Sequence, residues 1–305
     1  MGEWIQSLND ASVPFLLWLQ GFRNPALDGY MMLMSWLGSE FGYLFFFPFL
    51  YWAVNKRWGA LAGLALLTSV LIGDFIKWTF RLPRPSAPVE RLWEETSPGF
   101  VSTHASSSMA VLGTLALLAR KTWFSILAAL LILSIGLSRM YLGAHFPADV
   151  AGGWLVGAFT VWLMMRVAPR LEPTVLSWSP LRQAVVVLAA AALILLLYPG
   201  DWEGRRPAAS AVSNVGVFVG LLLGLIWDHR RLHFQADGSW PRRIGRYVVG
   251  MVLVAVVYFG LSVAFAPLGG GVYLIEQGLR LVRYMLVGLV ISGFAPWLFI
   301  RIGLA

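Results

Sequence analysis

The fold class is decided by the stretch VSTHASSSMAVLGTLALLARKTWFSILAALLILSIGLS, which covers residues 101–138. Its only formally charged residues are Arg120 and Lys121, which divide the stretch into two apolar runs of similar length. A transmembrane helix needs about 20 predominantly apolar residues. Each run therefore predicts one membrane-spanning helix, and the basic pair predicts the short loop between them.

The rest of the chain repeats this alternation of apolar runs and short polar loops. Of its 305 residues, 58% are hydrophobic and 12% are charged, whereas a soluble domain carries about 25% charged residues. The sequence predicts an all-α, polytopic transmembrane bundle of about nine spans. The expected spans are 29–55 (interrupted by Glu40), 58–73, 101–119, 122–138, 150–165, 183–200, 207–227, 247–268 and 284–300.

The N-terminal stretch from Trp4 to Phe22 carries Asn9, Asp10 and Pro14 within a short apolar pattern. We interpret it as an interfacial helix that lies along the membrane surface. Because the polar motifs described below end by residue 168, we expect two domains. Residues 1–168 form the core with the active site, and residues 169–305 form an extension of four transmembrane helices.

The formal net charge of +8 is explained by the loops, because cytoplasmic loops of membrane proteins are rich in Lys and Arg. We therefore predict no nucleic-acid partner, only membrane lipids. Every second loop along the chain belongs to a set that is much more basic than the other loops. The basic residues of this set are Lys56, Arg57, Arg120, Lys121, Arg166, Arg170, Arg182, Arg230, Arg231, Arg242, Arg243, Arg246 and Arg301. If this set is cytoplasmic, the N-terminus lies outside and the C-terminus inside. We expect the membrane to be a bacterial inner (plasma) membrane.

The opposite, non-cytoplasmic loops contain more polar chemistry than membrane topology requires. Three clusters, residues 77–85, 102–104 and 138–149, lie at span ends on this side and are rich in Lys, Arg and His. Charged groups near a membrane face are costly unless they are paired or functional. Arg and Lys side chains in such a group suit a phosphoryl ligand, which offers several acceptor oxygens and negative charge.

The spacing of residues within these clusters is distinctive. Lys77 is followed by six residues and then Arg84-Pro85, and Arg139 is followed by five residues, His145, three more and Asp149. This spacing resembles the type 2 phosphatidic acid phosphatase superfamily. The middle motif of the family is usually Pro-Ser-Gly-His, whereas this chain has Val-Ser-Thr-His at 101–104. Glycine allows close approach of backbone to phosphate, so Thr103 marks a departure in the phosphate loop.

The resemblance implies a role for each motif residue. His145 would be the nucleophile that forms a phosphohistidine, Asp149 the carboxylate that orients it, and His104 the general acid and base. Ser102, which is also a plausible N-cap for the following helix, would bind the phosphoryl oxygens together with Lys77, Arg84, Thr103 and Arg139. The resemblance implies no metal and no cofactor, and the chain has no Cys for thiolate chemistry.

The expected function is therefore the removal of phosphate from a lipid phosphate or diphosphate, on the non-cytoplasmic face. Two alternatives stay open at this point. A phosphotransferase would use the same phosphohistidine but pass the phosphoryl group to another acceptor. A degenerate, non-catalytic relative or a transporter would account for the altered middle motif and for the long extension, although glucose-6-phosphatases of the same superfamily have a similar nine-span layout.

Overall fold

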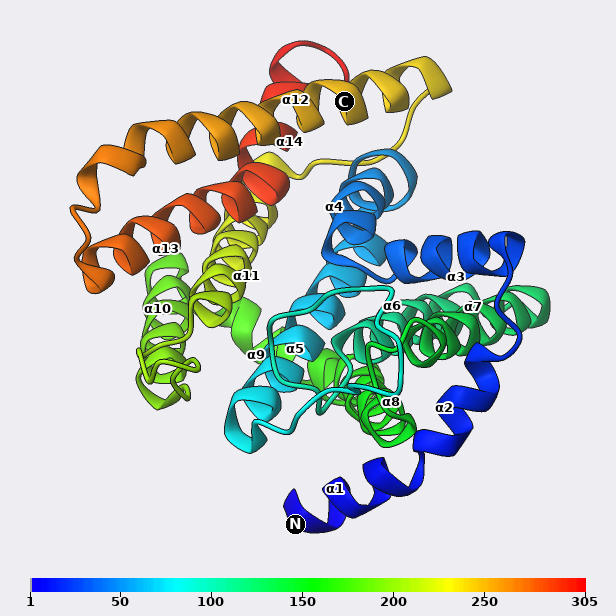
Figure 1. Cartoon of the computed structure of the whole chain (residues 1–305). Helices are drawn as coiled ribbons and strands as arrows, with labels where there is room; N and C mark the ends of the chain where they lie inside the picture. The colour runs from blue at the N-terminus through cyan, green and yellow to red at the C-terminus, as the bar shows by residue number, and fades with distance from the viewer. Residues whose placement is uncertain (1) are drawn as a thin grey trace. The chain divides into compact units, whose positions relative to one another are not determined.

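A computed structural model describes residues 2–305 of the protein, and these contain helices and connecting segments but no strand. The predicted all-α class is confirmed (Figure 1). In chain order the α-helices are α1 (Gly2–Ala11), α2 (Val13–Gln20), α3 (Pro25–Leu37), α4 (Glu40–Phe49), α5 (Lys56–Phe80), α6 (Thr103–Ala119), α7 (Thr122–Tyr141), α8 (Pro147–Trp162), α9 (Ala168–Ser177), α10 (Pro180–Leu197), α11 (Ala209–Trp227), α12 (Trp240–Phe265), α13 (Tyr273–Leu289) and α14 (Ala295–Arg301).

Seven helical segments are long and apolar enough to cross a membrane. They are Lys56–Phe80, Thr122–Tyr141, Pro147–Ser177, Pro180–Leu197, Ala209–Leu232, Trp240–Leu268 and Tyr273–Arg301. Two further apolar helical segments, Glu40–Val54 and Thr103–Ala119, are shorter than 18 residues. The protein is thus a polytopic membrane bundle, and the number of nine spans stays a prediction.

Two of the expected elements are each divided in the structure. The predicted span at 29–55 consists of α3 and α4, which are separated at Gly38 and Ser39, next to the Glu40 that interrupts the apolar run. The expected interfacial helix consists of α1 and α2, with Ser12 between them. Hydropathy does not reveal the break at Ser12, because this residue is uncharged.

The described chain forms two packed units. One contains residues 2–45 and 61–167, and the other contains residues 46–60 and 168–305. The chain passes between them within α4, within α5 and at Val167. The predicted functional division at residue 168 stays a prediction, and the packing assigns residues 46–60 to the unit that holds the C-terminal helices.

In the first unit, α6 packs closely against α8 through small residues. A Cβ atom on Gly153 would lie 2.5 Å from the backbone oxygen of Ser102, and one on Gly157 would lie 2.6 Å from that of Ser106. These glycines form a Gly-x-x-x-Gly pattern, which allows two helix backbones to approach closely in a membrane. The packing brings the first turn of α6 beside the first turn of α8.

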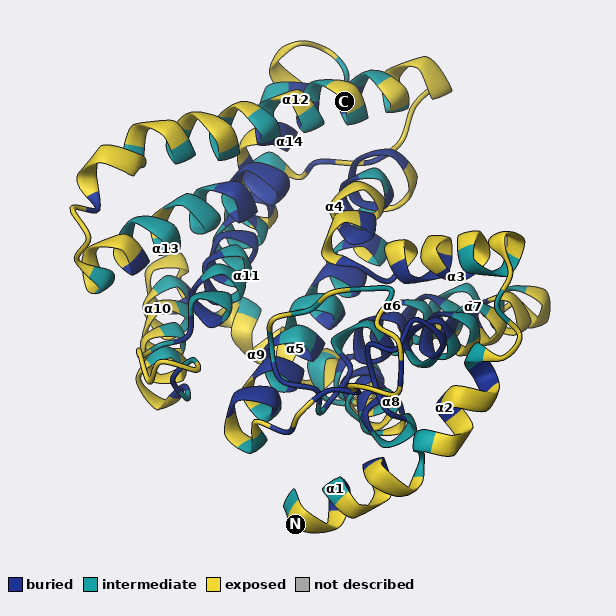
Figure 2. Ribbon diagram, viewed as in Figure 1, coloured by how far each residue is buried: buried dark blue, intermediate teal, exposed yellow. Residues whose placement is uncertain are grey.

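In the second unit, α11 packs against α13 by the same device. Gly216, Gly220 and Gly224 recur every fourth residue on α11, and a Cβ atom on Gly220 would lie 1.9 Å from the oxygen of Met285. By contrast α10 and α12 are largely exposed (Figure 2). Because their exposed side chains are predominantly aliphatic or aromatic, these two helices present surfaces suited to lipid.

Candidate active site

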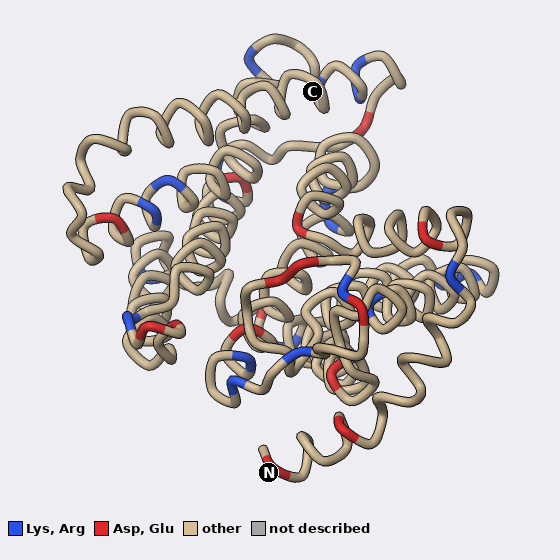
Figure 3. The backbone as a smooth tube through the Cα atoms, viewed as in Figure 1, with Lys and Arg blue, Asp and Glu red and all other residues tan. Residues whose placement is uncertain are grey.

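The three predicted motifs meet in the first unit, where a long irregular segment connects α5 to α6. This segment, residues 81–102, contains no helix and runs past the ends of α6 and α8 (Figure 1). We call it the site loop. Its charged residues are three Arg and three Glu, and Figure 3 shows both colours along it.

Hydrogen bonds of the backbone fix the site loop at several points. The amide of Gly99 donates to the oxygen of Leu82, closing the loop on itself at 2.8 Å. The amide of Leu92 donates to the oxygen of Leu142 at the end of α7, at 3.0 Å. The loop is therefore closed on itself and held at the end of α7, just before His145.

The N-terminal helices also hold this loop, which the sequence did not indicate. The side-chain nitrogen Nε2 of Gln20 donates to the backbone oxygens of Glu90 at 2.8 Å and Tyr141 at 3.1 Å. Arg23 makes ion pairs with Glu90 at 2.5 Å and with Asp28 at 3.2 Å. The segment predicted to be only interfacial is thus packed against the candidate site.

His145 lies in the short connection between α7 and α8 and is 1% exposed. Its Nδ1 lies 3.3 Å from Oδ2 of Asp149, and its Nε2 lies 3.0 Å from Nη1 of Arg84. Since a guanidinium group only donates, Nε2 accepts from Arg84 and Nδ1 carries the proton that faces Asp149. This tautomer leaves the Nε2 lone pair directed toward the cationic side of the site.

Electrostatics keep this imidazole neutral. Burial, followed by the positive charges of Arg84, Lys77 and Arg139, lowers the pKa of His145 well below its usual value. A neutral imidazole is the nucleophilic form. Burial likewise lowers the pKa of Arg84, although a guanidinium group stays protonated at neutral pH.

Asp149 is fully buried in the first turn of α8, which begins at Pro147. Its Oδ2 accepts the amide of Phe146 at 3.0 Å in addition to facing His145. A carboxylate is favoured at a helix N-terminus by the helix dipole and by the free amides there. Asp149 can therefore stabilise the start of α8 and orient His145 at the same time.

Ser102 is the N-cap of α6, as predicted, and its Oγ accepts the amide of Ala105 at 3.4 Å. Its own amide donates to the backbone oxygen of Asp149 at 2.9 Å. Thr103 begins the helix, and its methyl group lies close to Gly73 of α5. The β-branched residue is thus accommodated where α5 has no side chain.

His104 lies in the first turn of α6, within electrostatic range of His145. Its ring meets that of Trp93 edge-on, with centroids 6.3 Å apart. The Nε2 atom is buried and has no hydrogen-bond partner among residues 2–305. An unsatisfied imidazole nitrogen beside a cationic pocket is suited to exchange a proton with a ligand.

The three cationic side chains of the motifs are also buried at this place. Lys77, in the last turn of α5, donates from Nζ to the oxygen of Pro98 at 3.2 Å. Arg84 donates to the backbone oxygens of Ser97 at 2.7 Å and Ala144 at 2.8 Å. All the residues predicted for the site are therefore brought together, with their side chains half-buried or buried.

Arg139, in the last turn of α7, has partners that sequence reasoning missed. Its Nη1 donates to Oγ of Ser35 in α3, and its Nη2 donates to Oε1 of Glu95 at 2.7 Å. Its guanidinium carbon lies 5.2 Å from the ring centroid of Trp93. The only signal for Glu95 and Trp93 in the sequence is their place in a polar segment between the first two motifs.

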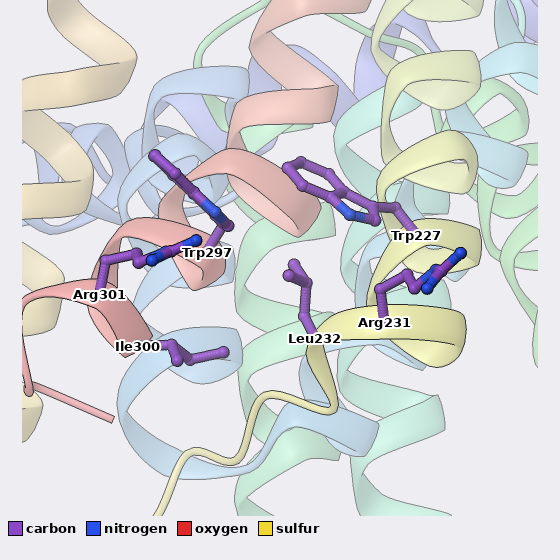
Figure 4. A pocket seen from close by; sticks show the side chains of 6 residues that line it. All are labelled: Trp227, Arg231, Leu232, Trp297, Ile300 and Arg301. Carbon is purple, nitrogen blue, oxygen red and sulfur yellow. The ribbon is translucent and has the colours of Figure 1, made fainter.

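Within residues 2–305 no group of three or more His, Asp or Glu side chains is arranged to hold a metal ion. A separate pocket of about 330 Å³ occurs in the second unit (Figure 4). Its lining residues are Trp227, Arg231, Leu232, Trp297, Ile300 and Arg301. This pocket contains none of the motif residues and no carboxylate or imidazole in its lining.

Comparison with known proteins identifies the family of the chain. Residues 58–173 match the family described as the PAP2 superfamily, and residues 212–305 match the PAP2 superfamily phosphatase, transmembrane extension. The chain belongs to the PAP2 superfamily. The resemblance inferred from the three motifs is confirmed, and the C-terminal helices are a recognised extension of the same superfamily.

The relatives of this superfamily member are named as phosphatases. The chain is 30% identical to a probable sphingosine-1-phosphate phosphatase of Dictyostelium discoideum, over 72% of this chain and 58% of that protein. It is 25% identical to the lipid phosphate phosphatase delta of Arabidopsis thaliana, covering 84% and 67% of the two chains. A transmembrane PAP2 type phosphatidylglycerolphosphate phosphatase from Bacillus subtilis superposes with a TM-score of 0.48 at 24% identity, covering 55% of this chain and 87% of that one.

Proposed function

We propose that this protein is an integral-membrane phosphohydrolase that removes phosphate from a lipid phosphate through a phosphohistidine on His145. The observation that carries the proposal is the environment of His145, whose Nδ1 faces Asp149 and whose Nε2 faces the buried cationic cluster. A neutral imidazole oriented by a carboxylate is a competent nucleophile toward phosphorus. The named activities of the relatives, which act on lipid phosphates, support the same reaction class.

The first half-reaction transfers the phosphoryl group to the enzyme. Nε2 of His145 forms a bond to phosphorus while the bond between phosphorus and the ester oxygen breaks. Protonated His104 gives its proton to the leaving oxygen, and a bound phosphoryl dianion favours that protonated state. Lys77, Arg84 and Arg139 stabilise the charge on the equatorial oxygens, for which Arg84 must turn from Nε2 toward the ligand.

The second half-reaction restores the enzyme. His104, now neutral, accepts a proton from water as the water oxygen attacks phosphorus, and the bond to Nε2 of His145 breaks. The products are inorganic phosphate and the lipid alcohol. Asp149 keeps the ring of His145 in one orientation through both steps.

The cleanest test is phosphate release by the purified full chain in detergent, with no acceptor other than water. A hydrolase releases inorganic phosphate from a lipid phosphate under these conditions, and EDTA should leave the rate unchanged. The panel should contain phosphatidic acid, a long-chain-base phosphate, phosphatidylglycerol phosphate, a polyprenyl diphosphate and glucose 6-phosphate. Phosphate transfer seen only when a lipid or sugar acceptor is added would identify a phosphotransferase, and no transfer at all would identify a non-catalytic relative.

The site is proposed to face the non-cytoplasmic side of a bacterial plasma membrane, with the N-terminus outside and the C-terminus inside. The distribution of Lys and Arg among the loops supports this orientation. In that orientation a lipid headgroup reaches the site from the membrane surface while its tails stay in the bilayer.

A further inference from the structure

One short part of the site loop receives hydrogen bonds from every cationic side chain assigned to phosphate. The oxygen of Pro98 accepts from Nζ of Lys77 at 3.2 Å and from Nη2 of Arg84 at 3.2 Å. The carboxylate of Glu95 accepts from Arg139 at 2.7 Å. The positions that would bind phosphoryl oxygens are therefore filled by the protein's own oxygen atoms.

The carboxylate of Glu95 is the anionic part of this arrangement. Its Oε1 lies 2.7 Å from Nη2 of Arg139, and its Oε2 lies 3.9 Å from Nη2 of Arg84. Two oxygens of one anion thus face two different guanidinium groups, as two oxygens of a phosphoryl group would. Arg84 and Arg139 make no other ion pair with a carboxylate of residues 2–305.

We propose that Glu95 is a competing anion of the phosphate site. Its carboxylate occupies the oxyanion position between Arg84 and Arg139, so that substrate phosphate must displace it and it returns when inorganic phosphate leaves. The residue thereby sets the affinity of the site for phosphomonoester substrate and for phosphate product. This inference rests on the proposed function, since it takes the two arginines as phosphate ligands.

Displacement needs the movement of one side chain and no opening of the loop. The side chain of Glu95 is 24% exposed, so it has a path from the arginines to water. The backbone around it is fixed independently, by the bond from Leu92 to Leu142 and by the bond from Arg84 to the oxygen of Ser97. A rotation of the Glu95 side chain therefore frees the position between Arg84 and Arg139 while the loop keeps its place.

The competition between Glu95 and phosphate should change the affinity of the site for phosphate by a measurable factor. When a site is open for only a fraction of the time, the apparent affinity is reduced by that fraction. An ion pair that closes the site nine-tenths of the time weakens phosphate binding about tenfold. Removing the charge of Glu95 should therefore tighten the binding of phosphate by about tenfold or more.

The experiment compares Glu95→Gln with Glu94→Gln in the purified full chain. Gln has the shape of Glu without its charge, and Glu94 is the exposed neighbour in the same loop, so both variants change the net charge equally. Equilibrium dialysis with radiolabelled inorganic phosphate measures the binding directly. We expect the dissociation constant to fall about tenfold in Glu95→Gln and to change less than twofold in Glu94→Gln.

A second variant, Glu95→Ala, removes the hydrogen bond that Gln can still accept from Arg139, and it should bind phosphate at least as tightly as Glu95→Gln. Unchanged or weaker binding in both Glu95 variants would overturn the inference and would make Glu95 a residue that positions Arg139. An equal gain in Glu94→Gln would also overturn it, because the gain would then come from net charge alone.

Lipid phosphate turnover separates this inference from the proposed function. Turnover by the wild type with unchanged phosphate affinity in the Glu95 variants would overturn the inference alone. Tighter phosphate binding in these variants with no turnover by any form of the protein would support the inference and overturn the proposed function.

Discussion

The two histidines of the site are in different surroundings, and the difference supports the roles proposed for them. His145 has both ring nitrogens engaged, by Asp149 and by Arg84, whereas Nε2 of His104 is buried without a partner. A nucleophile needs a fixed orientation, and a proton donor needs a free nitrogen that can reach the leaving oxygen. Substitution of each histidine should therefore distinguish the nucleophile from the general acid.

His145→Ala should abolish turnover of every substrate, because the covalent route is lost. His104→Ala should lower the rate by about 10²- to 10⁴-fold for an alkyl ester, the usual contribution of general acid catalysis. The loss at His104 should be much smaller for a nitrophenyl phosphate, whose leaving group needs no proton. Steady-state rates with both substrates check this, and equal losses in the two variants across leaving groups would contradict the assigned roles.

The lowered pKa of His145 also makes stability depend on pH. In the unfolded chain this imidazole takes up a proton near its ordinary pKa of about 6.5, while the folded state resists protonation to well below that value. The unfolded state therefore binds more protons as the pH falls below about 6.5, and stability is lost in that range. Between pH 7 and pH 5 the melting temperature of the wild type should fall more than that of His145→Gln, in matched detergent. Parallel curves for the two proteins would show that His145 titrates normally in the fold.

At the scale of the elements, the close approach of α6 and α8 determines the position of the site. The glycines of α8 allow the N-terminus of α6, with Ser102 and His104, to lie beside the turn that carries Asp149. A Cβ atom on Gly157 would lie 2.6 Å from the backbone oxygen of Ser106 and 2.6 Å from Cβ of Met109. Because both atoms are held by the backbone of α6, they have little room to move. The packing of α6 against α8 should therefore be disturbed by a single methyl group added at Gly157.

Gly157→Ala should destabilise the protein by about 1–3 kcal/mol through overpacking, and should lower turnover further by shifting His104 relative to His145. Gly29→Ala is the matched control, because a Cβ atom at Gly29, which also lies within a helix of the first unit, meets no atom within 4 Å. We expect a lower melting temperature and a lower rate for Gly157→Ala alone. Similar behaviour of the two variants would show that this contact does not position the site.

At the scale of the whole molecule, the asymmetry of basic residues predicts the orientation in the membrane. The segment at 228–246, which connects α11 to the first turns of α12, contains five of the Arg residues on the predicted cytoplasmic side, namely Arg230, Arg231, Arg242, Arg243 and Arg246. Positive residues in short loops are retained in the cytoplasm during insertion. The site loop should consequently lie on the opposite side.

The chain has no Cys, so single-cysteine labelling tests this topology directly. Ser239→Cys and Glu94→Cys place a thiol at exposed positions of the two loops. In intact cells a membrane-impermeant reagent should modify Glu94→Cys and spare Ser239→Cys until the cells are lysed. The reverse pattern would invert the predicted orientation and place the site in the cytoplasm.

The helical class, the superfamily and the N-cap at Ser102 could all be predicted from the amino-acid sequence. It also identified the motif residues that the fold brings together, including His104, Arg139 and His145. These features can be predicted because hydropathy, helix capping and the spacing of residues within a motif are local properties of the chain. A run of apolar residues predicts a helix wherever its partners lie, and Asp149 is one helical turn from His145.

The ion pairs and hydrogen bonds that these residues make depend on the tertiary structure. The ion pair of Glu95 with Arg139 joins the site loop to α7, and the bond of Arg139 to Ser35 joins α7 to α3. The sequence lacks any pattern for such contacts, because they depend on how closely helices approach through Gly153 and Gly157 and on the path of an irregular loop. The break at Ser12 was missed for a related reason, since a helix can end at an uncharged residue without any change in hydropathy.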